Sequence, residues 1–174
     1  MVAILDLKYY GDPILRKESS LIENIDSDLA QFAQDLIETM IVKKGIGLAA
    51  NQVGHDIRIY AVDPSSVNAD ERPFVLINPK IIETEGEQGG EEGCLSFPGL
   101  FENIIRPDRV LVEALDIDGN PIRMERNGLI ARVLLHEYDH LEGKLFIDYF
   151  SFLKKQLING KLRKLKAGDI EVFN

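Results

Sequence analysis

Two histidines four residues apart constrain this chain more than any other feature of its sequence. His136 and His140 lie in the segment LLHEYDHLEG, residues 134–143, with Glu137 next to the first of them. Residues four apart lie one turn apart on the same face of an α-helix. The spacing therefore predicts a helix that presents both imidazoles to one metal ion, with Glu137 beside it as a base. A catalytic site usually takes three protein ligands, so a third has to be found elsewhere.

Hydrophobic periodicity predicts three helices, of which the second carries the histidine pair. The first is amphipathic, with apolar residues at i, i+3, i+4 and i+7. Asp26 or Ser27 can cap its start, and Gly45 stands just past its end. Gly143 is placed to end the second helix. The predicted helices cover residues 28–43, 128–142 and 152–166.

Between the first two helices the sequence is rich in residues that favour β-strands. Residues 110–117 and 122–124 flank an Asp-Gly-Asn turn and predict a hairpin. The acidic, glycine-rich residues 83–91 are interpreted as a solvated loop. The order of helix, antiparallel strands, helix and helix indicates the α+β class rather than repeated βαβ units. The other predicted strands cover residues 57–62 and 74–82.

The charge balance excludes some classes of partner. The chain carries 20 Lys and Arg against 29 Asp and Glu, a net charge of −9, whereas a DNA-binding protein needs a basic surface. No apolar run approaches the roughly 20 residues that span a bilayer, and the start, MVAILDLKYYGD, lacks the basic region of a signal peptide. We therefore expect a cytoplasmic protein without a membrane or DNA partner, with residues 1–174 forming one domain.

The third metal ligand can be sought by elimination. Zinc peptidases with the HExxHxxGxxH pattern take a third histidine where this chain has Phe146. Asp148 is too close to lie on a returning helix, and the remaining downstream acids are in the last six residues. His55 has no supporting pattern around it. This leaves Cys94, where flanking glycines and a proline let the backbone approach a ligand, although a lone cysteine is more often a small buried hydrophobic residue.

Four segments have the order and spacing of motifs that occur together in one enzyme family. They are YGDPILRK (10–17), GIGLAANQ (45–52), EGCLS (92–96) and HEYDHLEG (136–143). In these segments the chain resembles peptide deformylase, and the resemblance spans nearly its whole length. One residue departs from the family pattern, because Leu135 stands where a glutamine is usual.

The resemblance implies a fold and a metal site. The fold is α+β, with antiparallel β-sheets around a central metal-binding α-helix, an N-terminal amphipathic helix and a C-terminal helix. Cys94, His136 and His140 would hold one divalent metal, with a water in the fourth position. The resemblance implies Fe²⁺ as the native ion, although cysteine and histidine ligands also suit zinc, and nickel or cobalt can occupy such a site.

The resemblance also implies the reaction, which removes the formyl group from the initiator N-formylmethionine of nascent polypeptides and releases formate. Glu137 would take a proton from the water and pass it to the leaving amine. The backbone N–H of Leu95 and the side-chain amide of Gln52 would stabilise the oxyanion, each contributing about 3 kcal/mol in the transition state.

The resemblance implies that the substrate adds as a strand beside the GIGLAANQ segment, and the methionine of the substrate needs an apolar pocket. We expect Ile46, Leu129 and Val133 to line this pocket, with Arg132 at its mouth. The alternative for these apolar residues is ordinary core packing, because pocket and core are lined alike. The glycines that would let the substrate lie against the backbone are Gly45, Gly47 and Gly93.

Charged residues outside the ligand set carry two further hypotheses. Arg106 is expected to pair with Glu92, Asp139 or both, and so to hold the cysteine loop to the histidine helix. The last predicted helix has six Lys and Arg and no acid. Such a helix is usually a solvated surface, and the alternative is a weak contact with ribosomal RNA.

Three rival functions remain open. A metallopeptidase would need a third ligand after His140, and the chain offers none that is well placed. An enzyme with Cys94 as nucleophile would not explain why two histidines and Glu137 share one helical turn. A non-catalytic relative that only binds peptides would keep the same motifs.

Overall fold

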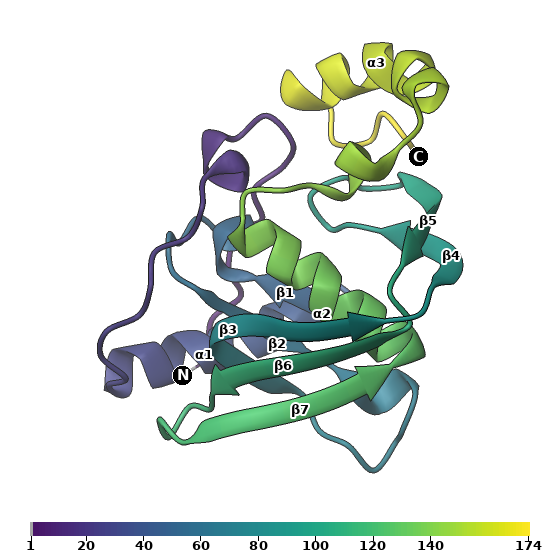
Figure 1. Ribbon diagram of the computed structural model, residues 1–174. Coiled ribbons are helices and arrows are strands. Elements are labelled where there is room, and N and C mark those ends of the chain that lie inside the picture. Colours follow the sequence, from purple (N-terminus) through teal and green to yellow (C-terminus); the bar gives the residue numbers. More distant parts are fainter. Residues whose placement is uncertain (1) are drawn as a thin grey trace.

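A five-stranded antiparallel sheet is the main element of the computed structural model, which describes residues 2–174 (Figure 1). The sheet has the order β1-β2-β3-β6-β7, and a separate two-stranded sheet pairs β4 with β5. The strands of the large sheet are β1 (Gly47–Ala49), β2 (Ile59–Val62), β3 (Phe74–Glu85), β6 (Arg109–Leu115) and β7 (Pro121–Asn127). The small sheet consists of β4 (Gln88–Gly93) and β5 (Phe101–Arg106).

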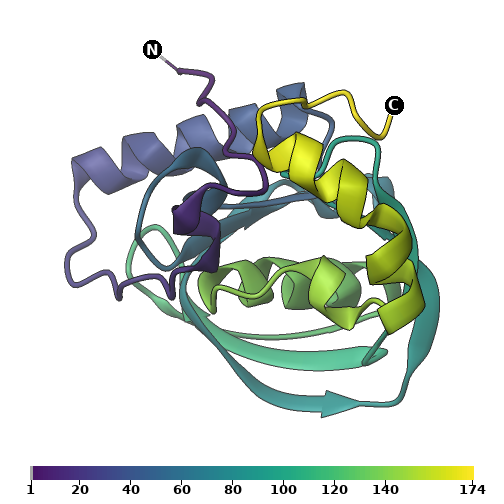
Figure 2. The ribbon, with the colours of Figure 1, turned by 90° about the horizontal axis from the view of Figure 1, so that it is seen from above.

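The large sheet curves around one helix and carries another on its outer face (Figure 2). The inner helix is α2 (Gly128–Leu141) and the outer helix is α1 (Ser27–Val42). Successive side chains of a strand point to opposite faces, so β2 contributes to two cores. Tyr60 and Val62 pack with α2, whereas Ile59 and Ala61 pack with α1. A strand buried on both faces therefore separates the two helices.

A third hydrophobic cluster lies on the other side of α2, below the C-terminal helix α3 (Phe152–Lys166). The loop between β4 and β5, residues 94–100, carries Cys94 and is called the cysteine loop. The cluster joins Phe97 and Leu100 of this loop to three residues of α3, which are Ile158, Leu162 and Leu165. The cysteine loop therefore packs on a core of its own. Short 3₁₀ helices complete the chain at η1 (Pro13–Arg16), η2 (Ala50–Val53), η3 (Pro64–Ser66) and η4 (Phe146–Tyr149).

The expected α+β class is confirmed, and the three predicted helices occur where the periodicity placed them. The side chain of Asp26 caps α1 by accepting hydrogen bonds from the N–H groups of Asp28 and Leu29. Gly143 follows α2 with a φ of 68°. After α1, however, the left-handed residue is Lys44, with a φ of 59°, and Gly45 comes one position later.

The interpretation of residues 83–91 as a solvated loop is wrong. β3 continues to Glu85, Gly86 turns the chain with a φ of 69°, and β4 begins at Gln88. The two strands belong to different sheets, and the glycines and acids concealed the second one because β4 lacks the apolar alternation that normally marks a strand. In the part of the chain that the structure describes, no helix is long and apolar enough to cross a membrane.

Candidate metal centre

One cysteine and two histidines meet at the inner end of a cavity. The Sγ of Cys94 and a ring nitrogen each from His136 and His140 all lie within 4.8 Å of one another. The Cys94 Sγ lies 3.3 Å from the Nε2 of His140. Cys94 follows directly after β4, and both histidines lie on α2 one turn apart, with ring centroids 5.0 Å apart. The three donors that the sequence singled out are therefore brought together.

A buried carboxylate fixes the orientation of one imidazole. The Nδ1 of His136 lies 2.5 Å from the Oε1 of Glu92, which leaves the Nε2 facing the cysteine side of the site. Burial opposes the ionisation of Glu92, but hydrogen bonds from His136 and Arg106 outweigh it and hold the pKa of Glu92 well below its usual range. Burial and the neighbouring His136 lower the pKa of His140, which keeps that ring neutral as a ligand must be.

Arg106 connects the loop that carries the cysteine to the helix that carries the histidines. Its Nη2 lies 2.6 Å from the Oε1 of Glu92, and its Nη1 lies 2.6 Å from the Oδ2 of Asp139. The hydroxyl of Tyr149 donates to the same carboxylate of Asp139, and its ring lies 4.4 Å from the guanidinium carbon. Tyr149 had no signal in the sequence, because it comes from η4 through the tertiary fold alone.

Glu137 lies buried beside the donors. It is 4% exposed, and burial raises the pKa of its carboxyl to about 7. Its Oε2 has no hydrogen-bond partner among the described residues. Gly47 makes room for this side chain, because a Cβ at that position would lie 2.4 Å from the Oε1 of Glu137. A carboxyl with a pKa near neutrality and an unpaired oxygen suits a general base.

Gln52 and Leu95 supply hydrogen-bond donors on the opposite side of Cys94. The Oε1 of Gln52 accepts from the N–H of Ala49, so its Nε2 is turned toward Cys94 Sγ at 3.4 Å and Ser96 Oγ at 3.2 Å. The N–H of Leu95 has no acceptor within residues 2–174. Ser96, which the sequence analysis did not single out, is fully buried and helps to set the orientation of the amide.

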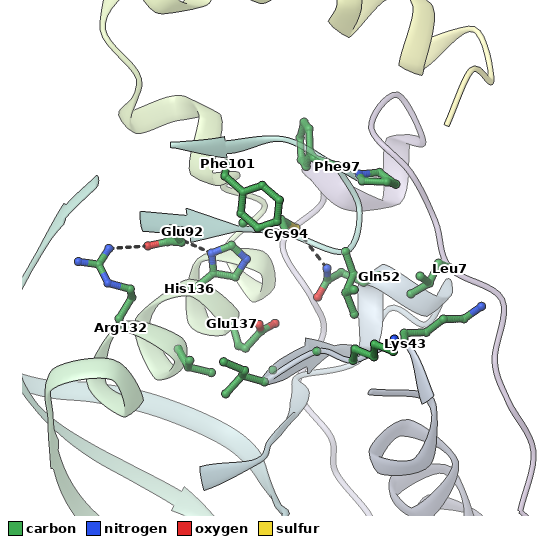
Figure 3. A pocket seen from close by; sticks show the side chains of 18 of the residues that line it. Leu7, Lys43, Gln52, Glu92, Cys94, Phe97, Phe101, Arg132, His136 and Glu137 are labelled. Atoms are coloured by element: carbon green, nitrogen blue, oxygen red, sulfur yellow. Dashed lines mark hydrogen bonds and ion pairs between the residues drawn. The ribbon is translucent and has the colours of Figure 1, made fainter. Parts of the chain in front are cut away.

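A cavity of about 510 Å³ opens from the donors to the surface. Its lining includes three of the glycines that the sequence analysis named, together with Ile46, Leu129 and Val133. Figure 3 shows Gln52, Cys94, His136 and Glu137 around the cavity. Leu129 is 41% exposed at the cavity, whereas Val133 is largely buried and also packs in the core around α2. The glycines are Gly45, Gly47 and Gly93.

The expectation that Arg132 stands at the pocket mouth is wrong. Arg132 lines the cavity but is only 4% exposed. Its Nη1 donates to Glu92 and to the carbonyl of Ile104, and its Nη2 donates to the carbonyl of Gln88. The guanidinium therefore ties α2 to both strands of the small sheet.

The alternative ligands lie elsewhere. The ring of His55 packs against Phe32, and Asp148 pairs with Arg16. Leu135, where the sequence departs from the deformylase pattern, is 9% exposed and belongs to the core between α2 and the large sheet. Its side chain adds apolar contact to that core rather than a hydrogen bond to the site.

The donor set fits one divalent metal. A tetrahedral ion bound at about 2.0–2.3 Å holds nitrogen and sulfur donors roughly 3.5 Å apart; the Cys94–His140 pair is 3.3 Å apart and all three donors lie within 4.8 Å of one another. Three protein donors leave one position open, which is the arrangement of catalytic rather than structural sites. The unpaired Oε2 of Glu137 beside this position is consistent with a water bound there.

Comparisons with known proteins agree with one another. A family model described as Polypeptide deformylase matches residues 4–156. The peptide deformylase of Alkalilimnicola ehrlichii is 46% identical, over 98% of this chain and 96% of the relative. The crystal structure of a peptide deformylase from Legionella pneumophila has a TM-score of 0.87 at 39% identity, over 95% of this chain and 96% of that one. A peptide deformylase from Synechococcus elongatus in complex with actinonin has a TM-score of 0.85 at 39% identity, covering 90% of this chain and 87% of that one.

Proposed function

The chain belongs to the polypeptide deformylase family, whose members hydrolyse the formyl amide of N-formylmethionyl peptides. We propose that its 174 residues act as one catalytic domain on nascent chains in the cytoplasm. The observation that carries the proposal is the convergence of Cys94, His136 and His140 beside the buried carboxyl of Glu137. When bound by these three residues, a divalent metal polarises the formyl carbonyl and makes water acidic enough to react at neutral pH.

Glu137 acts as the general base and then as the general acid. Its pKa near 7 lets it accept a proton from the attacking water and donate one to the leaving amine without a large penalty in either direction. The space left by Gly47 lets the carboxyl lie next to the reacting atoms.

Gln52 and Leu95 stabilise the oxyanion that develops on the formyl oxygen. The N–H of Ala49 donates to the Oε1 of Gln52 and so holds the amide with its NH₂ group toward Cys94. Two donors fixed before the reaction stabilise charge without reorganisation, each by about 3 kcal/mol. Glu92, Arg106 and Asp139 act indirectly, by holding His136 and α2 in place.

One assay tests the reaction. We expect the purified protein to release formate from formyl-Met-Ala-Ser, and Glu137→Ala to reduce kcat by about 10²- to 10⁴-fold with its metal content retained. A wild-type protein that holds a metal ion and yet releases no formate would overturn the proposal. It would leave a peptide-binding protein as the function, because such a protein would keep the same cavity.

The native metal is proposed to be Fe²⁺. A thiolate ligand beside ferrous iron is sensitive to oxygen, so activity should decay in air and persist under anaerobic conditions or after exchange to nickel or cobalt. Full activity after long aerobic storage, without added nickel or cobalt, would argue against iron.

The charge distribution supports ribosomal RNA as a partner of helix α3. The helix carries six Lys and Arg without an acid in a chain of net charge −9. Arg163 and Lys164 are exposed and suit a phosphate backbone. We expect Arg163→Glu/Lys164→Glu to reduce co-sedimentation with ribosomes at low salt, while unchanged co-sedimentation would exclude this helix as the contact.

A further inference from the structure

The edge strand β1 offers backbone groups to the cavity. β1 pairs with β2 on one side only, with Gly47 opposite Val62. The carbonyl of Ile46 accepts from the N–H of Asp63, so the backbone groups of Ile46 point toward β2. In an antiparallel ladder these groups alternate in direction, so the N–H and C=O of Gly47 point away from β2, toward the cavity that Gly47 lines. A peptide can therefore add to this edge as a further strand.

The position of Glu137 sets the direction of that strand. Glu137 lies against Gly47, so the formyl end of a bound peptide lies beside Gly47, and the peptide extends toward Gly45 because the N–H of Ala49 already donates to Gln52. The first residue then lies opposite Gly47, and a strand rises about 3.3 Å per residue. The third residue comes opposite Gly45, and the fourth comes beside Lys44 and Lys43, which also line the cavity.

Lys43 and Lys44 carry unbalanced charge. Both side chains are exposed, and within residues 2–174 neither has a carboxylate oxygen within 4.0 Å. In a chain of net charge −9 this is a local excess of positive charge at one end of the cavity. The backbone of Lys44 is left-handed, with a φ of 59°, which is uncommon for a residue with a side chain.

The other charged groups of the cavity lie away from this end. Figure 3 shows Lys43 and Leu7 at one end, Arg132 and Glu92 at the other, and Glu137 between them. Arg132 and Glu92 are paired with each other. Glu91, the remaining exposed acid of the lining, follows Gly90, where an added Cβ would lie 3.1 Å from the Nη2 of Arg132. The carboxylates that line the cavity are Glu91, Glu92 and Glu137, and none of them forms an ion pair within 4.0 Å with Lys43 or Lys44.

We propose that Lys43 and Lys44 select formylated peptides with an acidic side chain at the third or fourth residue. The inference rests on the proposed function, because it takes the formyl end of the peptide to lie at Glu137. An acidic side chain there gains attraction from two cations, and a basic one is repelled by both. The contact is the same in the ground state and in the transition state, so it changes KM rather than kcat.

The test uses C-terminally amidated peptides, so that no terminal carboxylate adds charge. The series is formyl-Met-Ala-Xaa-Ser and formyl-Met-Ala-Ser-Xaa with Glu, Gln or Lys at Xaa. We expect kcat/KM for Glu to exceed that for Lys by about three- to tenfold at low ionic strength in at least one series. The ratio should fall to within twofold near 0.5 M salt, where exposed charges are screened. Equal kcat/KM for Glu and Lys in both series would overturn the inference.

Two variants separate the local charge from the net charge. Lys43→Glu/Lys44→Glu should invert the Glu-to-Lys ratio. Arg72→Glu/Lys80→Glu makes the same change of net charge at exposed residues outside the cavity and should preserve the ratio. Inversion in the second variant would assign the preference to the overall charge and refute the local contact.

A binding measurement keeps this inference distinct from the proposed function. The deformylated peptides Met-Ala-Xaa-Ser and Met-Ala-Ser-Xaa, also amidated, are titrated by calorimetry, and the Kd ratio of Lys to Glu should again be about three- to tenfold. If no formate is released but the Kd ratio holds, the deformylase proposal fails and the charge selection stands. If formate is released and both ratios are near one, only the charge selection fails.

Discussion

Replacing Gly47 with alanine tests whether the position of Glu137 limits the reaction. The new Cβ would lie 2.4 Å from the Oε1 of Glu137, 2.7 Å from its Cγ and 2.8 Å from its Cδ. Ordinary contact begins at 3.4 Å, so the carboxyl must move by 3.4 − 2.4 = 1.0 Å or the strand must shift. A displacement of about 1 Å from the reactive geometry costs roughly 10²-fold in rate. We therefore expect kcat for formate release to fall about 10²-fold.

The matched control is Gly89→Ala in β4, where an added Cβ meets no atom within 4 Å. This variant should keep kcat within about twofold of wild type. Metal content and the midpoint of urea unfolding should be measured for both, so that loss of the ion or of the fold is separated from displacement of the base. If Gly47→Ala retains its metal and wild-type kcat, the reasoning that the position of the Glu137 carboxyl limits the reaction is refuted.

Three further predictions concern the support of the site and the fold. Arg106→Ala should weaken metal retention about 10- to 100-fold in a chelator competition assay, because Glu92 and Asp139 lose the cation that they share. The control Arg109→Ala removes an arginine from three exposed carboxylates and should retain the metal. Equal metal retention in both variants would refute the supporting role of Arg106. Leu135→Gln should lower the free energy of unfolding by about 1–3 kcal/mol in urea titrations, because it places an amide in an apolar core. An unchanged free energy of unfolding would show that the amide finds hydrogen-bond partners there. Burial opposes the ionisation of Asp148, but the hydrogen bond from Arg16 outweighs this effect and lowers the pKa of the Asp148 carboxyl. The Arg16–Asp148 ion pair should therefore stabilise the fold above about pH 4, and this stabilisation should be lost as the pH falls through the lowered pKa. Both side chains are more than 40% exposed, so Asp148→Asn should cost less than about 1 kcal/mol at pH 7 and less still at pH 2, and a cost that grows toward pH 2 would contradict the sign.

The helices and the ligand pair were accessible from the sequence because both depend on local spacing. An i, i+4 pair of histidines and an apolar stripe carry their geometry within one turn of helix. Four strands of the large sheet, β2, β3, β6 and β7, were predicted because their apolar residues reveal the buried faces, whereas the short glycine-containing β1 was not. The third ligand, Cys94, required elimination, because no local rule relates a loop residue to a helix 42 positions later in the chain.

The small sheet could not be predicted, and the error has a physical cause. β4 contains three glycines and two glutamates, a composition typical of a solvated loop. One of these glutamates, Glu92, points inward to two arginines and a histidine, so a charged residue occupies the buried position where a pattern search expects an apolar one. The buried position of Arg132 was missed for the same reason, because its partners belong to the unpredicted strands.

Polar side chains from three separate segments hold the histidine helix. Glu92 of β4 orients His136, and Arg106 of β5 binds Asp139. The Nδ2 of Asn51 in η2 donates to the carbonyl of His140, at 2.6 Å. Burying such groups costs free energy unless every partner is in place, so this network favours one arrangement of the helix over close alternatives. The helix supplies two ligands and the base, and the surrounding polar contacts determine how those groups face the cysteine.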